Sequence, residues 1–238
     1  MRAAVDVGNL IVWLPLELLL ISRLLRGEWR RFPFIFALVV AEFLMGVADA
    51  PRVLAVYLNM PDALNLRADT YVQIEFLDQV LLFAAVLSLI GLAAAHFQSR
   101  NLIRAACVGA ALVFGAISFW AEYDPHTKTL TWVTFWSRDL SVCTAILDVA
   151  LWLLLLGRRE KDWRLFLLSG ALGIQFSGAA IGDSLRSMAV QHHLRWLSFT
   201  GGIILISSNL ARIYIWARAF RPAVVTARVK EASARVGS

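Results

Sequence analysis

Long apolar runs separated by short polar connectors dominate the pattern of side chains along the chain. Most of these runs approach the length of about 20 residues that an α-helix needs to cross a bilayer. The pattern predicts an all-α integral membrane protein, a bundle of seven transmembrane helices over residues 1–219, followed by a short basic tail over residues 220–238. The predicted helices cover residues 7–25, 32–48, 71–97, 105–120, 132–157, 165–188 and 196–216.

The connector over residues 53–69 mixes apolar and polar positions. Such a mixture is typical of a segment that lies in the plane of the membrane surface. Pro51 precedes it and is expected to end or kink the second helix, because proline lacks an N–H group and clashes with the preceding turn. We therefore expect residues 53–69 to lie on the outer surface.

The predicted helix over residues 132–157 carries Arg138, Asp139 and Asp148 inside an apolar run. Ionisable side chains at such depth normally face other protein groups or water. Spacings of four, three and four residues also place a polar stripe on one face of this helix, formed by Ser137, Ser141, Thr144 and Asp148. We expect this helix to lie inside the bundle.

Basic residues gather in alternate connectors. The dense groups follow the first, fifth and seventh runs: Arg23, Arg26, Arg30, Arg31, Arg158, Arg159, Lys161, Arg164, Arg212, Arg218 and Arg221. Cytoplasmic connectors of membrane proteins carry an excess of Lys and Arg. The distribution predicts a multi-pass protein of the bacterial inner (cytoplasmic) membrane with its N-terminus outside and its C-terminus in the cytoplasm. We expect the first run to be a retained helix, because a cleaved signal carries its positive charges before the apolar core.

Composition supports a membrane protein. The chain is 59% hydrophobic and 17% charged, with a mean hydropathy of +0.67, which is far from the balance of a soluble domain. The formal net charge of +6 does not indicate nucleic-acid binding, because the bases lie in connectors between apolar runs. Cys107 and Cys143 both lie within apolar runs, so we expect buried thiols and no disulfide.

Four pairs of ionisable residues lie toward the outer ends of the predicted second, third, fifth and sixth helices. They are Asp49 and Arg52, Glu75 and Asp78, Arg138 and Asp139, and Asp183 and Arg186. One interpretation is an outward-facing polar pocket that binds a charged or zwitterionic ligand. The other is a set of ion pairs that neutralise one another and lock the outer half of the bundle.

A second set of acids, Glu17, Glu42 and Asp148, is expected nearer the middle of the membrane, with no Lys or Arg at the same depth. These side chains are candidates for a proton or cation relay. Alternatively they are neutral carboxylic acids that donate hydrogen bonds between helices. Asn209 is a candidate for a further partner.

No cofactor or metal site is expected. His192 and His193 are adjacent and do not share a helix face, so they lack a metal-ligand spacing. A retinal pigment would need a lysine in the last helix, where there is none. The sixth run contains a small-residue motif, Gly178 and Gly182, which predicts close packing against a neighbouring helix.

The chain resembles a group of small seven-helix bacterial membrane proteins of unestablished function. The similar runs read YVQIEFLDQVLLFAAVLSLI, SRDLSVCTAILDVALWLLL and FLLSGALGIQFSGAAIGDSL. The topology is also similar to the seven-helix sensor modules that precede bacterial histidine kinases. This resemblance carries over no functional residue, and because no kinase domain follows the seventh run, it implies signalling through a partner.

Three functions from different classes are open at this stage. The expected one is a non-catalytic receptor-like or accessory subunit that acts through another membrane or cytoplasmic protein. The second is a small-solute carrier coupled to protons or cations through the deeper acids. The third is an intramembrane hydrolase, which would need paired acids such as Asp78 with Asp139 or Asp183. The expected partners are the lipid bilayer and that second protein, without nucleic acid.

Overall fold

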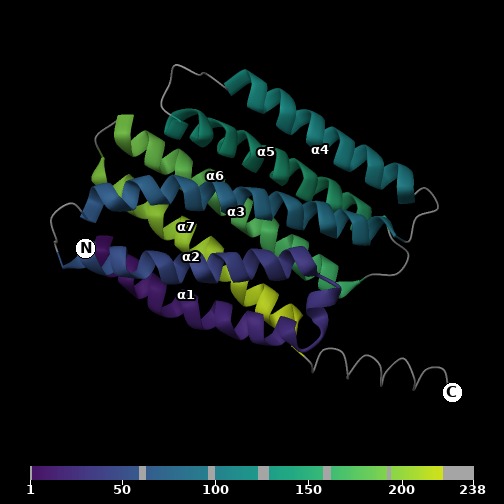
Figure 1. Cartoon of the computed structure of the whole chain (residues 1–238), viewed down its shortest axis with the longest axis horizontal. Coiled ribbons are helices and arrows are strands. Elements are labelled where there is room, and N and C mark those ends of the chain that lie inside the picture. Colours follow the sequence, from purple (N-terminus) through teal and green to yellow (C-terminus); the bar gives the residue numbers. More distant parts are fainter. Residues whose placement is uncertain are drawn as a thin grey trace.

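The computed structural model describes residues 2–58, 63–95, 100–122, 129–157, 162–191 and 194–221. Within these ranges the protein is all-helical, as predicted, with seven α-helices and one short 3-10 helix (Figure 1). They are α1 (Arg2–Leu25), η1 (Glu28–Arg30), α2 (Pro33–Tyr57), α3 (Ala63–Ala94), α4 (Arg100–Glu122), α5 (Thr129–Leu156), α6 (Trp163–Gln191) and α7 (Arg195–Ala219).

Five of the helices contain stretches long and apolar enough to cross a membrane, which indicates a membrane-embedded protein. The five stretches lie in α1, α2, α3, α5 and α6. The apolar part of α4, Ala105–Ala121, is shorter. The helix α7 is long enough, but it is interrupted by polar residues that include Asn209 and Arg212.

Six helices form a closed ring, and α4 lies outside it. Around the ring, α1 packs against α2, then α3, α5, α6 and α7 follow, and α7 packs back against α1. The helix α4 contacts α3 and α5 and forms one edge of the bundle (Figure 1). Its apolar side chains Leu112, Ile117 and Trp120 are 63%, 64% and 85% exposed, as expected of a surface that faces lipid.

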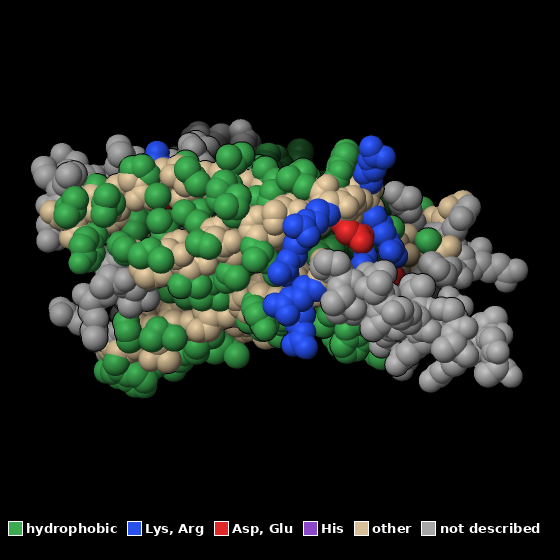
Figure 2. Space-filling model, turned by 90° about the horizontal axis from the view of Figure 1, so that it is seen from below, with side chains coloured by type: hydrophobic (Ala, Val, Ile, Leu, Met, Phe, Trp, Pro, Cys, Tyr) green, Lys and Arg blue, Asp and Glu red, His purple; other side chains and the backbone are tan. Residues whose placement is uncertain are grey.

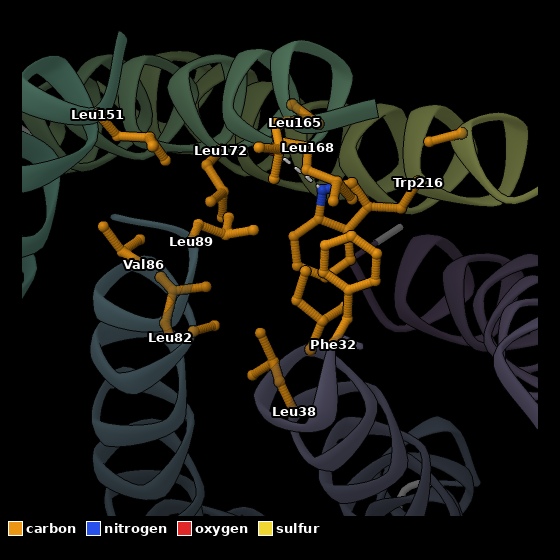
Figure 3. Close-up of a cluster of buried hydrophobic side chains, with 14 of the residues drawn as sticks. Phe32, Leu38, Leu82, Val86, Leu89, Leu151, Leu165, Leu168, Leu172 and Trp216 are labelled. Atoms are coloured by element: carbon orange, nitrogen blue, oxygen red, sulfur yellow. Dashed lines mark hydrogen bonds between the residues drawn. The ribbon is translucent and has the colours of Figure 1, made fainter. Parts of the chain in front are cut away.

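A cluster of buried apolar side chains joins α2, α3, α5, α6 and α7 on the inside of the ring (Figure 3). Leu82, Val86 and Leu89 project from one face of α3, as their spacing of four and three residues predicts. On the opposite side, the Trp216 indole N–H of α7 donates a hydrogen bond to the Leu168 carbonyl oxygen of α6 at 3.1 Å. The helix α7 is therefore fixed against α6 by apolar packing and by a buried hydrogen bond.

The closest approach between helices is that of α6 and α7. A Cβ atom added to Gly182 of α6 would lie 2.6 Å from Leu205 Cγ and 2.9 Å from the Gly201 carbonyl oxygen of α7. Both distances are shorter than any normal contact, so only glycine fits at this position. The Gly178 and Gly182 pair, predicted to pack closely, lies at this interface.

The basic end of the bundle is the end at which α1 and α7 finish. Figure 2 shows Lys and Arg side chains gathered toward this end of the face that it presents, while apolar side chains cover much of the rest. Two ion pairs join this end of the bundle: Arg31 with Asp162, and Arg164 with Glu28. They connect η1 and the residue after it to the start of α6.

The structure differs from the sequence-based expectation between the second and third helices. The helix α2 continues through Pro51 to Tyr57, and α3 begins at Ala63, so residues 53–57 and 63–69 are helical and do not form a separate surface segment. Prolines are tolerated inside membrane helices, where neighbouring groups satisfy the freed carbonyl. After Pro51, Val53 is buried and anchors the last turns of α2.

Candidate functional site

The centre of the candidate site is an ion pair between α2 and α7. Arg212 Nη2 donates a hydrogen bond to Glu42 Oε1 at 2.6 Å, and the two side chains are 1% and 6% exposed. The Arg212 guanidinium also lies over the Trp216 ring, with 5.0 Å between its central carbon and the ring centroid. Each buried charge is therefore held by a partner, which limits the cost of taking it out of water.

The two helices bring these side chains to the same level because they run in opposite directions. Glu42 lies about 13 Å along α2 from Pro33, and Arg212 lies about 10 Å before the end of α7. Since α2 begins and α7 ends at the basic end of the bundle (Figure 1), the two positions meet.

The sequence-based expectation that no base lies at the depth of Glu42 was wrong. It counted Arg212, with Arg218 and Arg221, among the bases at the exit of the predicted helix over residues 196–216. The helix instead continues to Ala219, and the bases near its end are Arg218 and Arg221. Arg212 is therefore an interior residue, almost two turns inside the helix.

Two further acids face this ion pair from neighbouring helices. The Asp78 carboxyl of α3 lies close enough to the Glu42 carboxyl to influence it electrostatically. The Glu17 carboxyl of α1 lies within the electrostatic influence of both Arg212 and Asp78. We call Glu17, Glu42, Asp78 and Arg212 the buried charge cluster. It joins α1, α2, α3 and α7.

Asp78 belongs to this deep cluster because α3 is longer than expected. The sequence analysis began the third helix at Tyr71 and placed Asp78 toward its outer end. The helix begins at Ala63, and Asp78 lies about 22 Å from that end.

The cluster contains polar atoms that are buried and have no hydrogen-bond partner among the described residues. They are both carboxyl oxygens of Glu17, Glu42 Oε2, Asp78 Oδ1, and Arg212 Nε and Nη1. Trp13 lies near Glu17 on α1, but it does not complete a hydrogen bond of standard geometry. Three carboxyls thus share one guanidinium, and the site suits a ligand that brings positive charge.

Asp148 lies in a different part of the interior. The Ser169 hydroxyl of α6 donates a hydrogen bond to Asp148 Oδ1 at 2.7 Å. Thr144, which shares the predicted polar stripe, donates instead to the Leu140 carbonyl oxygen of its own helix. The helix α5 packs against α3, α4 and α6, so Asp148 is not brought to Glu17 and Glu42.

Three residues of the expected outer pocket, Asp139, Asp183 and Arg186, lie in separate environments. The Ser118 hydroxyl of α4 donates to Asp139 Oδ2 of α5 at 2.7 Å. Asp183 and Arg186 form an ion pair of 3.7 Å with each other on the exposed surface of α6. Asp49 and Arg52 lie near the far end of α2. The side chains of Glu75 and Arg138 fall outside the described part of the structure.

Sequence reasoning missed Arg212, Trp216, Ser118 and Ser169 as partners of the interior charges. For Arg212 a signal was present, because Arg218 and Arg221 supply the bases expected at the end of the helix. For the two serines we find no signal in the sequence. Each bonds to an acid 21 residues away on the next helix, a relation that depends on packing.

No known protein family, curated protein or solved structure matches the chain. The similarity of the topology to bacterial sensor modules stays a prediction.

Proposed function

We propose that the protein is a receptor-like or accessory membrane protein that has no catalytic activity of its own and acts through a partner protein. The observation that carries the proposal is the buried ion pair between Glu42 and Arg212. It ties α7 to α2 about 10 Å before α7 ends at the basic end of the bundle. A change at the pair would move the end of α7, where a partner can detect it.

The proposal includes the topology. All seven α-helices cross the membrane, with the N-terminus outside and the basic end in the cytoplasm of a bacterial cell. The basic end seen in Figure 2 supports this orientation, because cytoplasmic connectors are rich in Lys and Arg. Burial of Arg212 against Glu42 supports α7 as a spanning helix in spite of its polar residues.

The test is native mass spectrometry of the protein extracted gently from its own membranes. We expect a complex with a second protein at fixed stoichiometry. Replacing the ion pair by Arg212→Gln is expected to weaken that complex, whereas the matched control Asp183→Asn, in an exposed side chain, is expected to leave it intact. Isolation of the wild-type chain without any second protein would overturn the proposal.

A second candidate is a proton- or cation-coupled carrier for a small solute. The observation that favours it is the excess of three carboxyls over one guanidinium inside the buried charge cluster. A carrier would show flux driven by a pH or cation gradient in proteoliposomes, lost in Glu17→Gln and retained in Asp183→Asn. Gradient-driven flux by the chain alone would favour this candidate over the accessory function.

A further inference from the structure

The charges of the four residues in the buried charge cluster do not sum to zero. Glu17, Glu42 and Asp78 would carry three negative charges if ionised, against the single positive charge of Arg212. Glu17 is fully buried, and Glu42 and Arg212 are 7% and 1% exposed. Unbalanced charges in such surroundings are strongly unfavourable. The cluster therefore needs positive charge from elsewhere.

The contacts of the described residues distinguish between a metal ion and protons as the source of that positive charge. A metal ion would need several carboxyl oxygens to converge on one point, and the described residues contain no such group of three His, Cys, Asp or Glu side chains. The Arg212 guanidinium within the cluster would also repel any metal cation. Neither argument applies to protons, because each proton binds one carboxyl oxygen and leaves a neutral side chain.

The arrangement of Glu42 and Asp78 supports this choice. Their carboxyl groups lie close enough to influence each other electrostatically. Two neighbouring carboxylates repel each other, so a buried pair of carboxyls favours a proton on one of them. One proton on this pair therefore removes the repulsion, and the charge that remains is balanced by Arg212, which bonds Glu42 Oε1.

The unpartnered atoms indicate what brings the proton. Arg212 Nε and Nη1 are buried donors without an acceptor, while Glu17 Oε1 and Oε2 and Asp78 Oδ1 lack donors among the residues that the structure describes. Water is the small molecule that can satisfy both kinds of group, and buried water normally occupies such places. Asn209 Oδ1, one turn before Arg212 on α7, is a further buried acceptor without a partner of its own.

We propose that the buried charge cluster is a hydrated proton-binding site that holds two exchangeable protons, one on Glu17 and one on the pair of Glu42 and Asp78, beside the Arg212 guanidinium. The protons come from bulk water. Each converts one carboxylate to a carboxylic acid, so that binding both changes the net charge of the cluster from −2 to zero.

On the surrounding helices, the following charged groups of the described part of the structure have their partners elsewhere. Arg23 of α1 donates to the Ala217 carbonyl oxygen of α7, nearer the basic end. Asp148 of α5 is bonded to Ser169 of α6. Asp139 of α5 is bonded to Ser118 of α4. On α6, Asp183 and Arg186 are exposed and pair with each other.

The experiment is infrared spectroscopy of the purified full chain in lipid nanodiscs at pH 7, which detects the carbonyl stretch of neutral carboxylic acids. We expect a band in the wild type that shifts in D₂O. Glu17→Gln and Asp78→Asn should each remove one proton equivalent of its area, and the double variant both. Asp183→Asn should remove none, and Asp148→Asn measures any separate contribution of that acid.

Equal band areas in the wild type and the double variant would overturn the proposal, as would a wild-type protein without any neutral-acid band. The neutral-acid band of the wild-type protein tests the proposal even if a variant fails to fold. The outcome is independent of the proposed function, because the spectrum counts protons on the isolated chain and depends on neither a partner nor flux.

Discussion

Arg212 is the residue on which the interior of the bundle most depends. One of its nitrogens bonds Glu42 of α2, and its guanidinium lies over the Trp216 ring of its own helix. The Trp216 indole in turn bonds the Leu168 carbonyl oxygen of α6. This chain of contacts connects α2, α7 and α6 through three side chains, all of them buried. A substitution of Arg212 is therefore expected to alter contacts on three helices.

Arg212→Ala is expected to lower the free energy of unfolding by about 3–5 kcal/mol, because it leaves the Glu42 charge buried without its partner. The double variant Arg212→Gln with Glu42→Gln removes both charges and is expected to recover most of that loss. The measurement is equilibrium unfolding in mixed micelles, with Asp183→Asn as control. If the double variant were as unstable as Arg212→Ala, the unpaired charge would not be the cause.

At the scale of the helices, the close approach of α6 and α7 depends on glycine at particular positions. A Cβ atom on Gly201 would lie 2.5 Å from the Gly182 carbonyl oxygen and 3.0 Å from Arg186 Cγ. The neighbouring Gly202 has no heavy atom within 4 Å of the same added atom. Two adjacent glycines of one helix thus differ completely in the space around them.

Gly201→Ala is expected to destabilise the bundle by about 1–3 kcal/mol, because the methyl group forces the two helix backbones apart. Gly202→Ala adds the same methyl group in open space, and is expected to be neutral or to stabilise by up to about 1 kcal/mol through helix propensity. Unfolding of the two variants under identical conditions is the measurement. Similar stability of both would mean that α6 and α7 separate at little cost.

The ends of the helices were the part of the fold that the sequence predicted least well. Apolar run length predicted all seven helices, because crossing a bilayer requires such runs. It could not predict that helices continue beyond the apolar zone, as α3 does over Ala63–Thr70. Depths counted from the wrong ends then placed Asp78 in the outer set, although it lies beside Glu42. The sequence thus identified the candidate acids, but which of them lie together depends on how the helices pack.

At the scale of the whole molecule, the two ends of the bundle provide a direct test of orientation. Arg30 is exposed at the basic end, and Asp183 is exposed toward the other end of α6. In a background with Cys107 and Cys143 replaced by Ala, single cysteines are introduced by Asp183→Cys or Arg30→Cys. On intact spheroplasts, a membrane-impermeant maleimide is expected to label Asp183→Cys only. Arg30→Cys should become reactive after permeabilisation, and the reverse pattern would contradict the proposed topology.

The buried pair of Glu42 and Arg212 also constrains how the protein is made. The two residues are 170 positions apart in the chain. At about 5–20 residues per second, a ribosome needs roughly 10–30 s to synthesise the arginine after the glutamate. During this interval α2 waits in the bilayer without its counter-charge. Since α7 carries Arg212 and is not among the five helices with a stretch apolar enough to cross a membrane, the proposed topology predicts that the acid already in place favours its insertion. Under the proposed topology, we expect the first helices to guide the last one into the membrane, so that the bundle is complete only after α7 has been synthesised.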